Sequence, residues 1–360
     1  MCNAVAVPED SLSERIFQST IHALELFGVY LGKRLGLYEA LRRQGPLSPL
    51  GLAQAAGIDP RYAREWLEQQ AVAGFIAVDR HIGDPAERQY SLPDAHVGVL
   101  VEDDDPEHVA PFAQMVAGIA AALPEVVDAY CTGEGVPYER YGADFRLGQG
   151  GINRPAFSQD LVDTWLPAIP DLDDLLKRKK GARIADVGCG EGWSTIALAK
   201  AYPDADVVGY DMDRASIIDA TAYAASLGVD ARFHCADAAH LAPEGPFDMI
   251  LLLETLHDMS YPTTVLGALR EALSPGGSIV IADERVAETF IAPGDEIERM
   301  MYGWSIVHCL PVAMAAPSSE AIGTAIRPGI VRDCALSAGF TRFDIMPIDN
   351  DLFRFYRLQH

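Results

Sequence analysis

The sequence has few cysteines, and none of them stands in a paired spacing. Six cysteines are scattered through 360 residues without a C-x-x-C motif, which argues against a disulfide scaffold and gives no metal-ligand spacing. We therefore expect no metal, and reduced thiols in a cytoplasmic protein. Acidic residues follow Met1 within ten positions, at Glu9 and Asp10, and we expect no signal peptide.

Positive charge and long hydrophobic runs are also scarce. The chain has 28 Lys and Arg against 52 Asp and Glu, a net charge of −24, and no large segment is basic. Nucleic acids and anionic membranes attract basic surfaces, so we expect neither as a partner. The most apolar stretch, 110–123, has 14 residues, fewer than the roughly 20 of a membrane-spanning helix. An acidic chain of this kind is free to bind neutral or cationic small molecules.

Residues 1–100 have the pattern of a helical domain with a winged helix-turn-helix. Apolar and turn-forming residues predict helices at 11–43, 47–56 and 61–74, a turn at 57–60, and strands near 75–78 and 89–92. The third helix mixes Arg61 and Arg64 with Glu65 and Glu68, so it lacks the positive field of a DNA-reading helix. We expect this domain to mediate dimerisation, with DNA binding as the alternative.

Residues 101–180 are expected to form a helical linker that also lines an acceptor pocket. The stretch 102–107 is acidic and contains a proline, which indicates a solvated joint. Residues 109–180 are predicted to be mostly helical, with a loop rich in Gly and Tyr at 133–151.

Residues 181–360 alternate between strand and helix patterns, which predicts an α/β fold with a doubly wound sheet. The apolar run 249–253 lacks alternation, as in parallel strands that are buried on both faces. A hairpin-like pair at 340–347 and 352–358 predicts an antiparallel strand near one edge. The other predicted strands lie at 183–187, 206–211, 231–235, 247–253 and 278–283, with helices at 193–201, 214–227 and 262–273.

A glycine-rich loop, Asp186-Val187-Gly188-Cys189-Gly190-Glu191-Gly192, follows the first of these strands. Glycines at such a turn let the backbone approach a ligand. A dinucleotide fingerprint needs a third glycine at position 193, which is Trp193, and no Lys-Ser/Thr pair follows as in a P-loop. The second strand ends in Asp211, which can accept bonds from both ribose hydroxyls, and Met212 can lie against an adenine.

The D-x-G-x-G-x-G pattern resembles motif I of the class I S-adenosylmethionine-dependent methyltransferases. Asp237 after the third strand and the turn 275–277 before the strand 278–283 continue that family's order. Over residues 11–360 the chain resembles bacterial small-molecule methyltransferases with an N-terminal winged-helix domain. The resemblance implies a Rossmann-like sheet, a homodimer built through the winged helix, and a lid of little helical regularity near 285–330.

The resemblance also implies which residues bind S-adenosylmethionine and the acceptor. In that family an acidic residue at the position of Asp237 contacts the adenine amino group, with a backbone amide nearby, although Asp211 as a helix cap and Asp237 as a turn former are structural alternatives. The expected cofactor residues are Asp186, Gly188, Gly190, Gly192, Asp211, Met212, Asp237, Ala238 and Glu254. The expected acceptor residues are Tyr138, Tyr141, Trp304 and His308, and we interpret His308-Cys309 as pocket lining, not as a metal site.

The segment 254–258, Glu-Thr-Leu-His-Asp, resembles the L-H-D-W segment of small-molecule O-methyltransferases, with Met259 in place of Trp. By that resemblance His257 is a general base for an acceptor hydroxyl, and Asp283 after the fifth strand orients it. A structural or substrate-contact role for His257 is the alternative. Glu254 and Glu284 are further acids that could instead anchor a cationic acceptor.

The sequence therefore predicts a small-molecule methyltransferase that acts on oxygen. Three alternatives stay open: methylation of nitrogen, carbon or sulfur by proximity alone, a ligand-sensing transcriptional regulator with a methyltransferase-like domain, and an enzyme that uses the sulfonium for non-methylating chemistry.

Overall fold

The computed structural model describes residues 11–79 and 83–360. The chain divides into two compact units, which we describe separately. Of the described residues, the winged-helix unit contains 11–118 together with 143–155, and the sheet unit contains 119–142 and 156–360. Helix α6 (Pro111–Thr132) runs from the first unit into the second.

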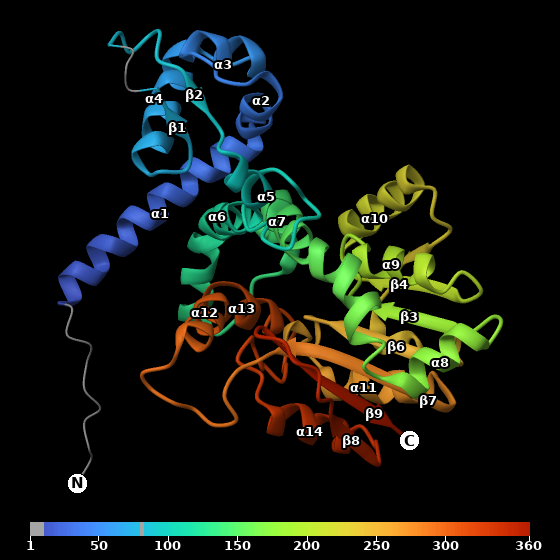
Figure 1. Ribbon diagram of the computed structural model, residues 1–360. Coiled ribbons are helices and arrows are strands. Elements are labelled where there is room, and N and C mark those ends of the chain that lie inside the picture. The colour runs from blue at the N-terminus through green and yellow to red at the C-terminus, as the bar shows by residue number, and fades with distance from the viewer. Residues whose placement is uncertain (1–10, 80–82) are drawn as a thin grey trace. The chain divides into compact units, whose positions relative to one another are not determined.

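The winged-helix unit begins with two helices where the sequence predicted one. Helix α1 ends at Arg34, and Gly36 takes a left-handed φ of 65° before α2 begins. Glycine adopts this conformation at no steric cost, which explains the break. Helices α3 and α4 start at the N-caps Ser48 and Asp59, and a short two-stranded wing follows them. The elements are α1 Leu12–Arg34, α2 Leu37–Gln44, α3 Pro49–Ala56, α4 Pro60–Val72, β1 Ala77–Val78, β2 Tyr90–Ser91, η1 Asp94–His96 and α5 Val97–Leu100 (Figure 1).

The predicted loop at 133–151 is wrong over most of its length, because helix α7 spans Gly142–Pro155. Two glycines in this region serve helix packing instead of a turn. A Cβ added to Gly148 would lie 2.7 Å from the backbone nitrogen of Met115, and one on Gly118 would lie 2.6 Å from that of Phe145. The absence of a side chain at both positions therefore lets α6 and α7 approach closely.

Helix α6 is also longer than its apolar run suggested. It has 22 residues, continues through Pro124, and is long and apolar enough, by length and composition alone, to cross a membrane. Only 33% of its most apolar window is buried, although Met115, Ile119 and Ala122 are buried on one face. A buried helix in a folded domain passes the same test, so this is weak evidence for a membrane span.

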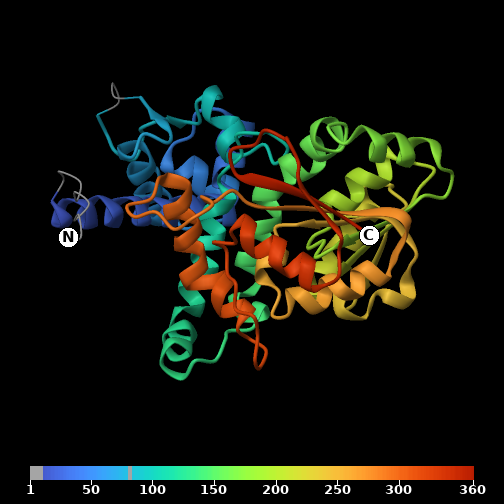
Figure 2. The same ribbon diagram turned by 90° about the horizontal axis from the view of Figure 1, so that it is seen from below.

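The sheet unit contains a seven-stranded sheet in the order β5-β4-β3-β6-β7-β9-β8 (Figures 1 and 2). The first five strands of that order run parallel, and β9 pairs antiparallel with both β7 and β8. This confirms the predicted Rossmann-like fold class with an antiparallel strand near one edge. The strands are β3 Arg183–Val187, β4 Asp206–Asp211, β5 Arg232–Cys235, β6 Phe247–Leu253, β7 Leu273–Glu284, β8 Arg342–Ile345 and β9 Phe353–Gln359.

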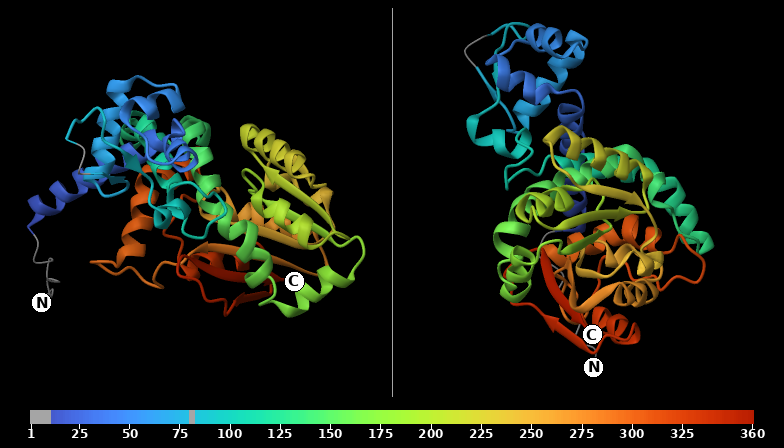
Figure 3. Two further views of the ribbon diagram at one scale, coloured as in Figure 1. Left: turned by 45° about the horizontal axis from the view of Figure 1, so that its top comes forward. Right: turned by 90° about the vertical axis from the view of Figure 1, so that its right-hand side faces the viewer.

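Helices cover both faces of this sheet (Figure 3). Strand β6 supplies Ile250 and Leu252 to one hydrophobic core, with residues of α11 and α14, and Met249 and Leu251 to the other, with residues of η3, α8 and α9. The unalternating apolar run is therefore buried on both sides, as predicted. The remaining elements are η2 Tyr138–Tyr141, the π-helix η3 Ala156–Trp165, α8 Pro170–Arg178, α9 Trp193–Ala201, α10 Arg214–Leu227, η4 Ala238–His240, η5 Ala242–Glu244, η6 Leu256–Asp258, α11 Pro262–Glu271, α12 Glu296–Trp304, the π-helix η7 Ser305–Cys309, α13 Leu310–Ala313 and α14 Pro328–Ser337.

The close packing of α6 on α7 gives a stability prediction. Gly148→Ala places a methyl group against the Met115 backbone, and overpacking of this kind costs roughly 1–3 kcal/mol. Gly267→Ala in α11 is the matched control, because its Cβ meets nothing within 4 Å and should stabilise by about 0.4–1 kcal/mol. The midpoints of urea unfolding measure both effects. A Gly148→Ala protein as stable as the wild type would show that the helices are not packed at this glycine.

Candidate active site

The glycine-rich loop joins β3 to α9 through three left-handed glycines. Their φ values are 73° at Gly188, 51° at Gly190 and 80° at Gly192. A Cβ on Gly188 would overlap Thr255 Oγ1 at 2.2 Å, and one on Gly192 would lie 2.6 Å from the Phe233 ring. A Cβ on Gly190 would meet nothing within 4 Å. The outer two glycines thus permit close packing, whereas the backbone at Gly190 is open to a ligand.

Asp186 connects the end of β3, before the loop, to the start of α9, after it. Its Oδ2 accepts hydrogen bonds from the hydroxyls of Ser194 and Thr195, both at 2.6 Å. Burial raises the pKa of the Asp186 carboxyl to about 6, against the lowering effect of these two bonds. Because the side chain is buried and bonded to α9, its contribution to a cofactor site is to position the loop.

Asp211 at the end of β4 connects that strand to the loop. Its Oδ2 accepts a hydrogen bond from Gly190 N at 2.9 Å, and its Oδ1 accepts one from Asp213 N at 2.7 Å. Burial raises the pKa of the Asp211 carboxyl, although the backbone hydrogen bonds lower it. The N-cap of α10 is Asp213, so the helix-cap alternative for Asp211 does not describe its position.

The other expected cofactor residues lie around the same strand ends. Met212 follows Asp211 and is 70% exposed. Asp237 Oδ1 accepts a hydrogen bond from Ala239 N at 2.9 Å, which makes Asp237 the N-cap of η4, while Ala238 is buried. Asp237 therefore forms a turn, as the structural alternative stated, and still follows β5. Glu254 directly follows β6 and takes an unusual φ of 48°.

His257 and Asp283 form a buried pair at the ends of β6 and β7. His257 Nδ1 lies 2.6 Å from Asp283 Oδ1, which also accepts a hydrogen bond from Glu284 N at 3.0 Å. The other ring nitrogen, His257 Nε2, lies 3.3 Å from Asp258 Oδ1. Both nitrogens of the imidazole thus face a carboxylate. We call His257, Asp258, Asp283 and Glu284 the carboxylate–histidine cluster.

The electrostatics of the cluster favour a protonated histidine. Burial alone lowers the pKa of His257, but the charges of Asp283 and Asp258 outweigh it and raise that pKa well above its usual value. Burial and the charge of Glu254 raise the pKa of Glu284 well above the normal range for a carboxyl. His308 responds in the opposite way, since burial lowers its pKa to about 4.

The structure brings three of the expected acceptor residues together. The His308 ring lies 4.5 Å from the Tyr141 ring and 5.8 Å from the Tyr138 ring, in edge-to-face contacts. Tyr141 also donates a hydrogen bond to Val307 O at 2.9 Å. Trp304 ends α12, one turn before His308.

The segment expected to be an irregular lid is instead helical from 296 to 313. A π-helical turn, η7, joins α12 to α13 and leaves both His308 and Cys309 buried. Adjacent residues point about 100° apart on a regular α-helix, so a widened turn helps to bury both, and π-turns occur often at functional sites. The expectation of little helical regularity over 285–330 is therefore wrong for 296–313, whereas 285–295 and 314–327 contain no helix.

Sequence reasoning assigned no role to Asp258, and it offered Glu284 only as an acid that could anchor a cationic acceptor. Asp258 was visible as the residue after His257, and Glu284 as the one after Asp283. Only the fold shows that Asp258 faces the second ring nitrogen of His257 and that Glu284 is buried beside it.

Metal-ligating atoms also meet in the cluster. Those of His257, Asp258 and Cys309 lie within 4.8 Å of one another, as do those of His257, Asp283 and Glu284. Burial raises the pKa of the Cys309 thiol to about 12, so a metal ion in the first group would have to displace a firmly held proton. The expectation of no metal is thus open to a direct test by metal analysis.

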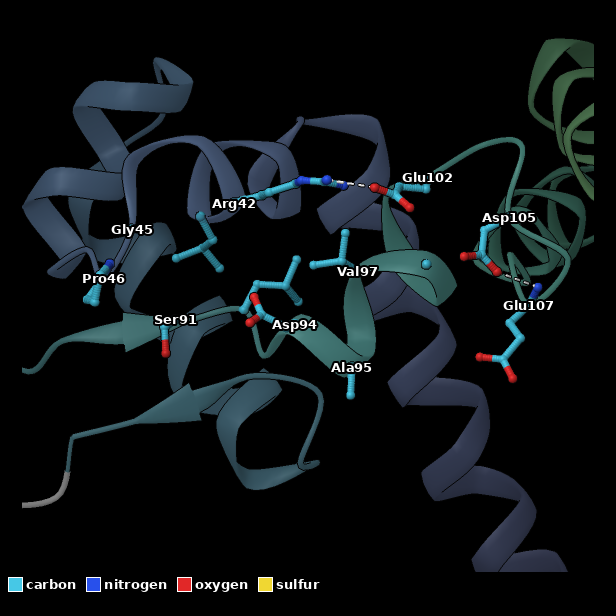
Figure 4. Close-up of a pocket in the computed structure, with 13 residues that line it drawn as sticks. Arg42, Gly45, Pro46, Ser91, Asp94, Ala95, Val97, Glu102, Asp105 and Glu107 are labelled. Carbon is cyan, nitrogen blue, oxygen red and sulfur yellow. Dashed lines mark hydrogen bonds and ion pairs between the residues drawn. The ribbon is translucent and has the colours of Figure 1, made fainter.

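The winged-helix unit has a separate pocket of about 640 Å³, between α2 and the segment that follows β2 (Figure 4). Its charged lining residues are Arg42, Asp94, Glu102, Asp105 and Glu107. Arg42 pairs with Glu102 at 2.6 Å, which leaves the lining acidic. None of the expected site residues lines this pocket.

Comparison with known proteins gives two domain matches. Residues 178–317 match the family described as Methyltransferase domain, and residues 23–102 match the Rv2258c-like winged HTH domain. Trans-aconitate 2-methyltransferase of Streptomyces avermitilis is 33% identical over 35% of this chain and 48% of its own length. Ubiquinone biosynthesis O-methyltransferase of Roseobacter denitrificans is 38% identical over 27% of this chain and 39% of its own. The chain thus matches less than half the length of these relatives.

The fold of nearly the whole chain is similar to that of solved methyltransferase structures. Human N-acetylserotonin methyltransferase, solved in complex with S-adenosylmethionine, superposes with a TM-score of 0.67 at 15% identity, over 98% of this chain and 99% of the human one. The fold is therefore that of the class I methyltransferases. More particularly, the chain combines a methyltransferase domain over residues 178–317 with an N-terminal winged-helix domain over residues 23–102.

Proposed function

We propose that this protein transfers a methyl group from S-adenosylmethionine to a hydroxyl oxygen of a small molecule. The observation that carries the proposal is the position of the His257–Asp283 pair. Strands β3, β4, β6 and β7 are parallel, so the glycine loop, Asp211, His257 and Asp283 all follow strand ends at one edge of the sheet. Ligands of open α/β sheets bind at this edge.

The residues at this edge suit the parts of the cofactor. The open backbone at Gly190 can approach the ligand closely, and Asp211 can exchange its bond to Gly190 N for bonds to the ribose hydroxyls. Met212 can cover the adenine, and Asp237 with the Ala238 amide can contact the adenine edge. Glu254 directly follows β6 and can contact the cofactor from that strand end.

The bound cofactor supplies an electrophilic methyl group on a sulfonium and leaves as S-adenosylhomocysteine. His257 would take the proton of the acceptor hydroxyl as the methyl group passes from sulfur to that oxygen, and the electron pair of the broken sulfur–carbon bond would stay on sulfur. Asp283 fixes the imidazole tautomer and stabilises the imidazolium that results. The acceptor must reach His257 Nε2, so Asp258 has to move or to bind the acceptor itself.

The regulator alternative has less support in the winged helix. On helix α4, Arg61 pairs with Glu65 at 2.5 Å and Arg64 with Glu68 at 3.1 Å, so its cations are partly neutralised. Phosphate binding relies on cations that can exchange their counterions for DNA. Methylation of nitrogen, carbon or sulfur by proximity alone remains the alternative for the chemistry.

Cofactor binding is tested at Asp211. Asp211→Ala removes a charged acceptor whose hydrogen bonds to the ribose are worth about 1.5–3 kcal/mol each, so the dissociation constant should rise at least about tenfold. Asp206→Ala, at the opposite end of β4, is the matched control and should bind as the wild type does. Isothermal titration with S-adenosylhomocysteine measures both. Unchanged affinity in Asp211→Ala would show that the carboxylate does not contact the cofactor.

The general base is tested at His257, with an acceptor identified from a panel of phenols, amines and thiols. His257→Ala should lower turnover by about 10²–10⁴-fold, and cofactor affinity should stay within about threefold. Asp283→Asn should lose less activity, because it keeps the shape and one hydrogen bond. A chelator-treated wild type serves as the control for metal dependence. Turnover that survives His257→Ala would assign transfer to proximity alone.

The same reaction should show a characteristic pH dependence. The base must be neutral to accept a proton, and Asp283 and Asp258 raise the pKa of His257. In the pH–rate profile, activity should therefore rise with a midpoint above 6.5, the usual pKa of histidine. Replacing Asp283 with Asn should move this midpoint to lower pH, and His257→Ala should remove the rise.

We also propose a homodimer built through helix α1, whose apolar side chains face solvent in the single chain. Phe17, Leu24 and Leu31 are 63%, 63% and 47% exposed, and with Thr20 and Phe27 they follow the alternating three- and four-residue spacing of a helix-packing seam. Sedimentation should give a mass near twice 38.9 kDa. Leu24→Glu should shift it toward the monomer, and Gln18→Glu on the same helix should not. A wild-type monomer at micromolar concentration would refute the dimer.

A further inference from the structure

Asp258 is the member of the carboxylate–histidine cluster that solvent can reach. Its side chain is 18% exposed, compared with 4% for His257 and 0% for Asp283. Asp258 Oδ1 is buried against His257 Nε2 at 3.3 Å, so the exposed part of the side chain lies on its other atoms. A molecule that approaches the cluster therefore meets Asp258 before it meets the imidazole.

The expected acceptor residues converge on the same carboxylate. The thiol of Cys309, the residue after His308, lies within 4.8 Å of ligating atoms of both Asp258 and His257. Burial and the charges of Asp211, Asp213 and Asp258 raise the pKa of Tyr138, and burial and the charges of Cys309 and Asp258 raise that of Tyr141. The tyrosines and Cys309 come from η2 and η7, which are far from η6 in the sequence, and the two tyrosine rings pack against His308. Asp258 therefore lies close to both η2, which carries the two tyrosines, and η7, which carries His308.

The cluster carries more negative than positive charge. Three carboxyl groups, Asp258, Asp283 and Glu284, adjoin one imidazole, and Glu254 adds a fourth acid close to Glu284. Among the described residues, Asp283 Oδ2 and Glu284 Oε2 are buried without a hydrogen-bond partner. Buried carboxylates are stable only when paired, and even a protonated Glu284 leaves two carboxylates against one imidazolium. The surroundings therefore favour a positive ligand and disfavour an anionic one.

We propose that Asp258 binds the methyl acceptor and that this acceptor carries a protonated amine or another cationic nitrogen. This inference rests on the proposed function and names the substrate class of the same site. The carboxylate of Asp258 accepts hydrogen bonds from the ammonium group, and such charge-assisted bonds are stronger than neutral ones. An acceptor with a carboxylate or phosphate in that position would be repelled.

Three phenols with the same ring and the same two-carbon arm test the charge preference. Tyramine is cationic, para-ethylphenol is neutral and para-hydroxyphenylpropionate is anionic. Equilibrium binding of each to the full-length protein is measured by calorimetry, with and without saturating S-adenosylhomocysteine. Tyramine should bind at least about tenfold more tightly than the anionic phenol, since one favourable close charge pair replaces an unfavourable one. Ethylphenol should lie between them.

Asp258→Asn keeps the shape of the side chain and removes its charge. In this variant tyramine and ethylphenol should bind about equally, while the affinity for S-adenosylhomocysteine is unchanged. Asp206→Asn, outside the cluster, is the control and should keep the wild-type order. The melting temperature of each variant shows that it is folded. The wild-type order of the three phenols stands as an independent test if Asp258→Asn does not fold.

The proposal is overturned by a flat or reversed order in the wild type, by binding of none of the three phenols, or by an undiminished preference in Asp258→Asn. Failure of the proposed function has a different signature. In that case S-adenosylhomocysteine gives no heat with the wild type, whereas the charge order measured without it still reports on Asp258.

Discussion

The parallel pairing of β3 with β4 and β6, and of β6 with β7, is the constraint on which the site depends. Parallel strands end at the same edge, so residues that are up to about a hundred positions apart become neighbours there. The hydrophobic runs that bury each strand on both faces fix this register. A slip of one strand would separate the glycine loop from Asp211 or His257 from Asp283.

Buried carboxylates are the second feature of this edge of the sheet. Asp186 is buried against two hydroxyls, Asp211 against two backbone amides, and Asp283 against His257. Each carboxylate has a defined partner whose interaction offsets part of the free-energy cost of removing the charge from water. The Asp258 and Glu284 carboxyls are less fully compensated, which is why we assign a cationic ligand to that part of the site and not to the glycine loop.

The winged-helix unit shows how one motif can serve different functions. Its helix order, caps and wing are those of a DNA-binding module, yet the arginines of α4 pair with glutamates one turn away. Helix α1 exposes a row of apolar side chains, the surface through which we propose that the chain dimerises. A fold of this kind therefore does not identify its partner, and the charges and apolar residues on its surface have to be considered instead.

The sequence by itself determined the sheet strands, the glycine loop, Asp211 and the His257–Asp283 candidates, because strong local patterns specify them: unbroken apolar runs, glycines at a turn, and acids at strand ends. It did not determine that Gly118 and Gly148 pack helices, that α1 and α2 separate at Gly36, or that 296–313 is helical. Only the tertiary structure placed Asp258 against the second nitrogen of His257, Cys309 beside both, and the two tyrosine rings against His308. The tyrosines precede His308 by more than a hundred residues. The direction of the Asp258 side chain and contacts over such a separation depend on the fold, so a local sequence pattern does not predict them.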